Sequence, residues 1–200
     1  MRADLQLITK LVPERSDVLD LGCGDGELLA YLMHHKGVKG YGIEIDSANI
    51  QCCIERRVNV IEQNLNQGLS NFQTKSVDVV VMSQALHEVR YPDQLLDEML
   101  RVGRYSIVTF PNFGYWRCRW DLFSKGQMPI TKTLPYAWYN TPNIHLCTIE
   151  DFENHCREQS IDIRQRYILD HHNQRNEWMN RMPNLFGVSA IYQISRAASS

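Results

Sequence analysis

Short apolar runs alternate with amphipathic stretches along the first half of the chain. Runs typical of buried strands are expected at 17–21, 39–45, 58–62, 77–82 and 105–110. Between them, apolar residues recur at helical spacing, so helices are expected near 5–12, 25–36, 48–56 and 92–103. The run 77–82 is almost entirely apolar, which indicates a strand buried on both faces. This alternation is typical of an open α/β sheet.

The pattern changes at Asn112. The stretch 112–147 is rich in aromatic residues and is interrupted by prolines. Thr148 and Asp151 have the spacing of a capping box, which predicts a helix that continues through Cys156. Two alternating runs, 161–169 and 188–194, are expected to form the last strands. The polar stretch 171–184 between them is expected to be a loop.

The chain has 200 residues, a formal net charge of -2 and a sequence pI ≈ 6.4. This length fits one domain, which we expect to span residues 1–200. A near-neutral charge does not indicate nucleic-acid binding, no apolar run is long enough to cross a membrane, and no secretory signal is visible at the start. The six cysteines form no Cys-x-x-Cys pair, so we expect reduced thiols, no metal site and a cytoplasmic location.

A glycine-rich loop follows the first expected strand. Its sequence, Asp20-Leu21-Gly22-Cys23-Gly24-Asp25-Gly26, places an acid before three glycines at alternate positions. A dinucleotide fingerprint has Gly-x-Gly-x-x-Gly, and Glu27 stands where its third glycine would lie. Because a carboxylate there would repel a pyrophosphate, the loop favours a ligand with positive charge near its ribose. S-adenosylmethionine, which carries a sulfonium and an amino group, is such a ligand.

Glu44 lies at the end of the second expected strand, about twenty residues after the glycine loop. A carboxylate at that place can accept both hydroxyls of a ribose. An acid at a strand end is, on its own, more often a solvated turn residue, and this is what we expect of Asp46. The glycine loop favours the ribose role for Glu44.

The glycine loop resembles motif I of class I S-adenosylmethionine-dependent methyltransferases, whose usual form is acidic-x-Gly-x-Gly-x-Gly. The resemblance implies an α/β fold: a single Rossmann-like domain with a mixed seven-stranded sheet and helices on both faces. It also implies a site for S-adenosylmethionine or its product S-adenosylhomocysteine. The expected cofactor-binding residues are Asp20, Gly22, Cys23, Gly24, Glu44, Ile45, Asn64, Leu65, Ser83 and Leu86. Asn64 stands where this family commonly has an acid that meets the adenine amino group.

No catalytic residue can be assigned from the sequence. His87 and Glu88 suggest a base and its orienting acid, but neighbours on a helix diverge by about 100°. Gln84 and His87 are as readily polar loop residues without a ligand contact. Because methyl transfer from a sulfonium depends mainly on positioning, the lack of an evident base does not exclude catalysis.

The aromatic stretch 112–147 is expected to be an insertion over the active site. Its candidates for substrate or partner contact are Tyr136, Trp138, Tyr139, Asn143 and His145. They can form the floor of an acceptor pocket, or a protein-binding face, because aromatic side chains supply contact area at low entropic cost. The third reading is an extra layer of core.

Over nearly its whole length the chain resembles the methionine biosynthesis protein MetW family. The resemblance rests on the residues 18–26, 83–86, 98–104, 110–114, 134–145 and 184–187. The two aromatic stretches among these are far more specific than the glycine loop. The resemblance implies a role in methionine biosynthesis beside a homoserine O-acyltransferase, which in some bacteria needs the MetW-type protein for good activity.

Two hypotheses from different classes follow. In the first, the protein binds S-adenosylmethionine as a regulatory signal and contacts the acyltransferase through the aromatic stretch. In the second, it is an active methyltransferase on a small-molecule acceptor, which the region 136–145 would hold. The family resemblance favours the first hypothesis.

Overall fold

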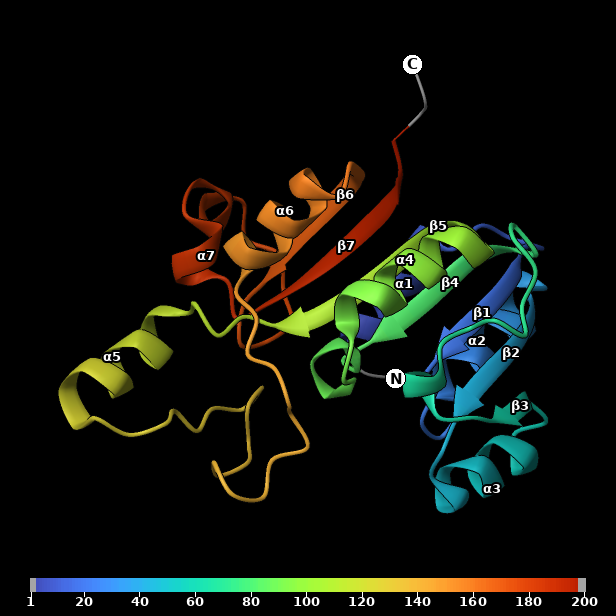
Figure 1. The fold of residues 1–200 in the computed structure, drawn as a ribbon, viewed down its shortest axis with the longest axis horizontal. Helices are drawn as coiled ribbons and strands as arrows, with labels where there is room; N and C mark the ends of the chain where they lie inside the picture. The colour runs from blue at the N-terminus through green and yellow to red at the C-terminus, as the bar shows by residue number, and fades with distance from the viewer. Residues whose placement is uncertain (1–2, 198–200) are drawn as a thin grey trace.

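Seven strands form one sheet in the order β3-β2-β1-β4-β5-β7-β6 (Figure 1). The computed structural model describes residues 3–197, so residues 1–2 and 198–200 of the expected domain lie outside the described part. Strands β1 to β5 pair in parallel, whereas β7 is antiparallel to both neighbours. The bounds are β1 Asp17–Leu21, β2 Lys39–Glu44, β3 Asn59–Glu62, β4 Val77–Ser83, β5 Gly103–Pro111, β6 Ile161–Leu169 and β7 Ser189–Arg196. The expected mixed seven-stranded sheet is confirmed.

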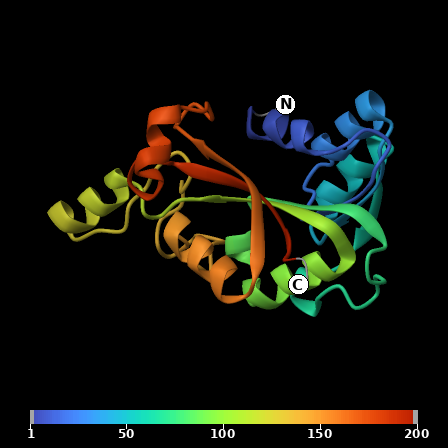
Figure 2. The ribbon, with the colours of Figure 1, turned by 90° about the horizontal axis from the view of Figure 1, so that it is seen from above.

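Helices cover both faces of this sheet (Figure 2). The α-helices are α1 Ala3–Leu11, α2 Glu27–Lys36, α3 Ser47–Glu55, α4 Pro92–Val102, α5 Trp116–Lys125, α6 Ile149–Glu158 and α7 Pro183–Phe186. Three short 3₁₀ turns are η1 Leu65–Gln67, η2 Leu86–Glu88 and η3 Glu177–Arg181. Among the described residues, no helix has the length and apolar character needed to span a bilayer.

Strand β4 contributes to two separate cores because alternate side chains of a strand point to opposite faces. Val79 and Val81 are fully buried in the core that includes α1 and α2. Val80 and Met82 are fully buried in the core that includes α4 and α6. The all-apolar run therefore becomes a central strand covered on both sides, as the sequence predicts.

The order in which strands are added to the sheet changes side between β1 and β4, although the strands themselves stay parallel. The next parallel strand after β1 along the chain is β2 on one side, whereas β4 pairs with β1 on the other side. In open α/β sheets, ligands bind beyond the carboxyl ends of the strands at such a switch point. The glycine loop after β1 and the residues that follow β4 meet at this place.

Local capping signals set several helix starts. Thr148 Oγ1 accepts from the Asp151 N–H at 3.1 Å and Asp151 Oδ2 accepts from the Thr148 N–H at 3.1 Å, which confirms the expected capping box. Asp46 is more than a turn residue, because its Oδ1 accepts from the Asn49 N–H at 2.9 Å and caps α3.

The expected loop 171–184 is wrong in part. It contains η3 and the start of α7, which Pro183 opens and whose end is closed by a Gly187 N–H to Pro183 O bond of 2.8 Å. Proline at the first helical position and glycine after the last one favour a helix here, against the polar composition that favours a loop.

Residues 113–147, which we call the arm, leave the sheet after β5 and return at α6. Helix α5 lies within the arm and projects away from the sheet (Figures 1 and 2). Gly126, with φ +63°, ends α5, and its N–H donates to Leu122 O at 3.1 Å. The returning chain is held to η2, because the N–H groups of Ile144 and His145 donate to His87 O at 2.8 and 3.0 Å.

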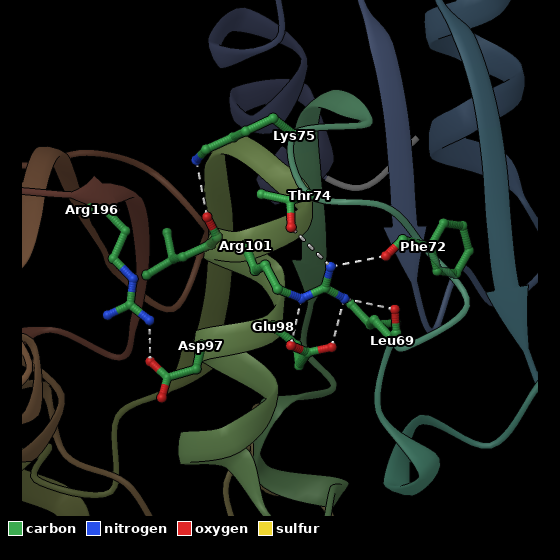
Figure 3. Close-up of polar contacts among 9 residues, drawn as sticks. Leu69, Phe72, Thr74, Lys75, Asp97, Glu98, Arg101 and Arg196 are labelled. Carbon is green, nitrogen blue, oxygen red and sulfur yellow. Dashed lines mark hydrogen bonds and ion pairs between the residues drawn. The ribbon is translucent and has the colours of Figure 1, made fainter.

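Arg101 on α4 fastens the connection between β3 and β4 (Figure 3). Its guanidinium donates to the carbonyl oxygens of Leu69 and Phe72, each at 2.9 Å. Its Nε and a terminal nitrogen also donate to the two Glu98 carboxylate oxygens, at 2.7 and 2.8 Å. This connection begins with η1, so the bonds fix a segment that reaches the carboxyl edge of the sheet.

Candidate ligand-binding cleft

A cleft in two parts opens at the carboxyl ends of β1 and β4. The first part, about 330 Å³, lies between the glycine loop and the start of α1. The second part, about 600 Å³, lies between the end of β2, η1 and the residues after β4. Gly22 and Ser83 line both parts, so the two adjoin. An elongated ligand with two chemically different ends fits such a cleft.

The glycine loop needs its glycines for backbone conformation and for space. Gly22, Gly24 and Gly26 have φ of +67°, +55° and +76°, a region that other residues rarely adopt. A Cβ on Gly22 would lie 3.2 Å from the Cβ of Ala85, which follows β4. Gly22 therefore allows the loops after β1 and β4 to approach each other closely beneath the cleft.

Glu44 braces the glycine loop from the end of β2. Its Oε2 accepts from the Gly24 N–H at 2.8 Å, and its Oε1 accepts from the N–H groups of Ile45 and Asp46 at 2.7 and 3.0 Å. The side chain is 8% exposed and lines the second part of the cleft. The carboxylate is thus held in one orientation, and a carboxylate has lone pairs left for a ribose hydroxyl.

Asp20 at the end of β1 is 2% exposed, and its buried Oδ1 has no hydrogen-bond partner. Burial and, to a smaller extent, the negative charge of Glu44 together raise the pKa of its carboxyl to about 7. The residue lines the first part of the cleft. A buried carboxyl without a partner is costly, and a cationic ligand group would supply the missing partner.

The electrostatic character of the whole cleft is acidic. The described residues that line its two parts include no Lys, Arg or His. The acids that line it are Asp20, Asp25, Glu27, Glu44, Asp46 and Glu88. One of them, Asp25, is paired with Arg56 at 2.7 Å. The absence of cations among these described lining residues disfavours a phosphate and favours a ligand that carries positive charge.

The structure brings nine of the ten expected cofactor-binding residues together. The first part of the cleft is lined by Asp20, Gly22, Cys23, Gly24 and Ser83. The second part is lined by Gly22, Glu44, Ile45, Asn64, Leu65 and Ser83. Leu86 lies elsewhere: it is buried in the core under α4 and lines a separate apolar cavity. The 3₁₀ turn η2 directs its side chain inward, so we leave it out of the candidate site.

The five expected contact residues of the aromatic stretch do not line the cleft. Tyr136, Trp138 and Tyr139 are exposed, which contradicts an extra core layer for these three. Trp138 and Tyr139 stack edge to face at 5.7 Å. Asn143 is half-buried, and His145 borders the separate cavity with its Nε2 3.3 Å from Arg90 O. Of the open readings, the exposure favours a protein-binding face.

Leu5 lines the cleft although the sequence does not indicate it as a ligand-binding residue, and Gln84, for which a ligand contact and a polar loop are both open, lines the cleft too. Gln84 has φ +58°, and its N–H and Nε2 donate to Thr109 Oγ1 at 3.0 and 3.1 Å. A left-handed residue next to a ligand site is a frequent functional feature, but the sequence does not reveal it. Leu5 reaches the cleft only because α1 packs beside the glycine loop. This contact depends on the tertiary structure and cannot be predicted from the local sequence.

His87 and Glu88 do not form a close dyad. Their nearest atoms, His87 Nε2 and Glu88 Oε1, are 4.0 Å apart. Burial lowers the pKa of His87 to about 4, so the imidazole is neutral at pH 7. His87 lines the separate cavity, whereas Glu88 lines the cleft. The imidazole therefore does not line the cleft, and His87 and Glu88 do not act there as a base and its orienting acid.

Several solved structures with the same fold are described as S-adenosylmethionine-dependent methyltransferases. The one from Mesorhizobium loti matches with a TM-score of 0.70 and 14% identity over 97% of this chain and 98% of that chain. A possible histamine N-methyltransferase from Thermotoga maritima matches with a TM-score of 0.66 and 16% identity, over 98% and 88%. The [4+2]-cyclase SpnF matches with a TM-score of 0.68 and 16% identity, over 98% and 81%.

The fold thus places the chain in the class of proteins built like S-adenosylmethionine-dependent methyltransferases. A family model described as methionine biosynthesis protein MetW matches residues 2–194, and the chain belongs to this family. A bifunctional methionine biosynthesis protein MetXA/MetW from Rhodopirellula baltica is 31% identical over 98% of this chain. The chain spans about one third of the length of that relative, 33%.

Proposed function

We propose that the protein binds S-adenosylmethionine or S-adenosylhomocysteine in the two-part cleft and acts with a homoserine acyltransferase in methionine biosynthesis. The observation that carries the ligand proposal is the acid-lined cleft with the unpaired Asp20 Oδ1 at its base. The amino and sulfonium groups would meet the acids of the first part. Glu44 would hold the ribose, and Asn64 with Leu65 would border the adenine.

The partner proposal is supported by the relative whose name joins MetXA and MetW in a single chain. Fusion holds two protein units at a high local concentration, which is useful where the two units work together. A ligand changes the partner only if it binds the free and the complexed protein with different affinity. We therefore propose that S-adenosylmethionine, a product derived from methionine, modulates the acyltransferase through this protein.

Methyl transfer to a small-molecule acceptor is the second candidate function. The favouring observation is the fold, because two of the three solved structures named above are described as S-adenosylmethionine-dependent methyltransferases. Bound S-adenosylmethionine would supply an electrophilic methyl group. The chain itself would bind and orient the cofactor through Asp20 and Glu44. The cyclase with the same fold is a reminder that the fold alone does not define the reaction.

The test combines the purified chain with the homoserine acyltransferase of the same organism. We expect a complex, a higher acyl-transfer rate and a rate that changes when S-adenosylmethionine is added. Glu44→Gln should preserve the complex and weaken the response to the ligand. No complex and no rate change would sink the partner proposal. Labelled product from methyl-labelled cofactor and a metabolite extract would favour the second function instead.

A further inference from the structure

Helix α5 presents an apolar stripe to solvent. Trp116, Trp120 and Phe123 recur at i, i+4 and i+7, which places them on one side of the helix. Trp120 is 58% exposed and Phe123 is 85% exposed, with their rings 6.1 Å apart. An amphipathic helix normally buries such a stripe against the rest of the domain. Clustered exposed apolar side chains on a projecting helix mark a surface that another molecule covers.

Beside this stripe lies a cavity of about 840 Å³, formed between α5 and residues 130–133. It shares no lining residue with the ligand cleft. Its walls combine aromatic side chains with three cations, Arg117, Lys125 and Lys132. Asp121 is the one acid among the described lining residues, and its Oδ1 lies 2.6 Å from Lys125 Nζ. Two cations are therefore left without an acidic partner in the cavity.

We propose that the arm, residues 113–147, is the docking surface for the homoserine acyltransferase, and that the cavity takes an apolar segment of that enzyme flanked by Asp or Glu. This assignment rests on the proposed function and names its contact surface. The relative that joins MetXA and MetW in one chain supports this occupant. The acidic flanks follow from charge complementarity with Arg117 and Lys132.

A second copy of this chain is the competing occupant. In a symmetric dimer the same patch would face itself, so the cations of one arm would face those of the other. Like charges across an interface oppose association. The same arm offers a partner with acidic residues both an apolar centre and a charged rim, which is the usual composition of a specific interface.

The experiment measures the dissociation constant of the full chain and the purified acyltransferase by calorimetry. The double variant Trp120→Ala, Phe123→Ser should raise the constant about tenfold or more, the scale for exposed aromatic anchors. Arg117→Glu with Lys132→Glu should also raise it about tenfold and abolish its dependence on salt. The control is Ile54→Ser on α3, because Ile54 is 57% exposed, close to the 58% of Trp120, and the change should leave the constant unchanged.

Each result has a defined meaning. A complex that the arm variants form as well as the wild type overturns the docking surface and leaves the proposed function intact. No complex with the wild type overturns both. Loss of a dimer in the arm variants, seen by size-exclusion chromatography, makes a second copy the occupant and overturns the assignment. Unchanged affinity of the variants for S-adenosylmethionine excludes misfolding as the cause of a loss.

Discussion

Asp20 combines burial, an unpaired oxygen and a nearby carboxylate in one side chain. Because its pKa is raised to about 7 from 3.8, the folded free protein binds a proton that the unfolded chain has already lost between those pH values. The contribution of Asp20 to folding is therefore most favourable below pH 3.8 and is lost as the pH rises through about 7. A cationic ligand should offset the cost of ionising the buried Asp20 carboxyl.

We expect the affinity for S-adenosylmethionine to rise with pH from 6 to about 8, with proton release on binding, because the ligand stabilises the Asp20 carboxylate. Calorimetry in buffers of different ionisation enthalpy measures both quantities. Asp20→Asn should bind more weakly and lose the pH dependence in this range. An unchanged pH profile in that variant would show that another group titrates instead of Asp20.

Glu44 performs two tasks with one carboxylate, since it accepts three backbone N–H groups and faces the cleft. Glu44→Gln should weaken ligand binding by about 1–3 kcal/mol, the cost of losing a charged acceptor. The matched control is Glu62→Gln, because Glu62 is the exposed register partner of Glu44 on β3. Equal affinities for the two variants would contradict the ribose role.

At the scale of single elements, helix α4 stabilises the wall of the cleft from outside. Arg101→Met removes the bonds to two backbone carbonyls and to Glu98, so the free energy of unfolding should fall by about 2 kcal/mol. Urea denaturation measures this. Arg104→Met is the control, because Arg104 is largely exposed and makes one ion pair of 3.3 Å, worth about 0.5 kcal/mol. Similar losses in both variants would contradict the anchoring role.

Elements with a local signal could be predicted from the sequence, whereas α5 could not. β1 and β6 have the expected bounds because alternation and turn residues act within a few positions. In the arm, aromatic residues and flanking prolines mask the helical spacing of Trp116 and Trp120. Gly126 after Lys125 marks only the end of α5, as Gly37 after Lys36 marks the end of α2, and a glycine alone does not indicate that a helix precedes it.

The residues of the candidate site also divide into those with a local sequence signal and those placed by the tertiary structure. Gly22 and Glu44 belong to motifs whose spacing carries the chemistry, and both line the cleft. Leu86 was misplaced because the direction of a side chain after a strand depends on the turn that forms, here η2. Leu5 enters the site through the packing of α1, which no short-range pattern encodes.

At the scale of the whole molecule, the arm and the sheet should differ in local stability. The exposed Lys125 is the last residue of α5, and the exposed Lys132 lies in the irregular segment that follows, so trypsin should cut at these two residues first. Mass spectrometry of a short digestion identifies the first cut, and the sheet should survive it. Earliest cleavage after Lys36 or Arg57 would contradict this order. The acyltransferase should protect both lysines.

Strand β7 follows β6 along the chain but is inserted between β5 and β6. On the ribosome, β5 is complete at Pro111 yet has no neighbour on that side until Ser189 to Arg196 have been synthesised. Once β6 has been made, it too has no strand to pair with until β7 follows. The nascent chain therefore carries an unpaired strand edge from the end of β5 until β7 is made, and this edge is open to pairing with other chains. A product that stops before β7 lacks the strand that joins β6 to the rest of the sheet.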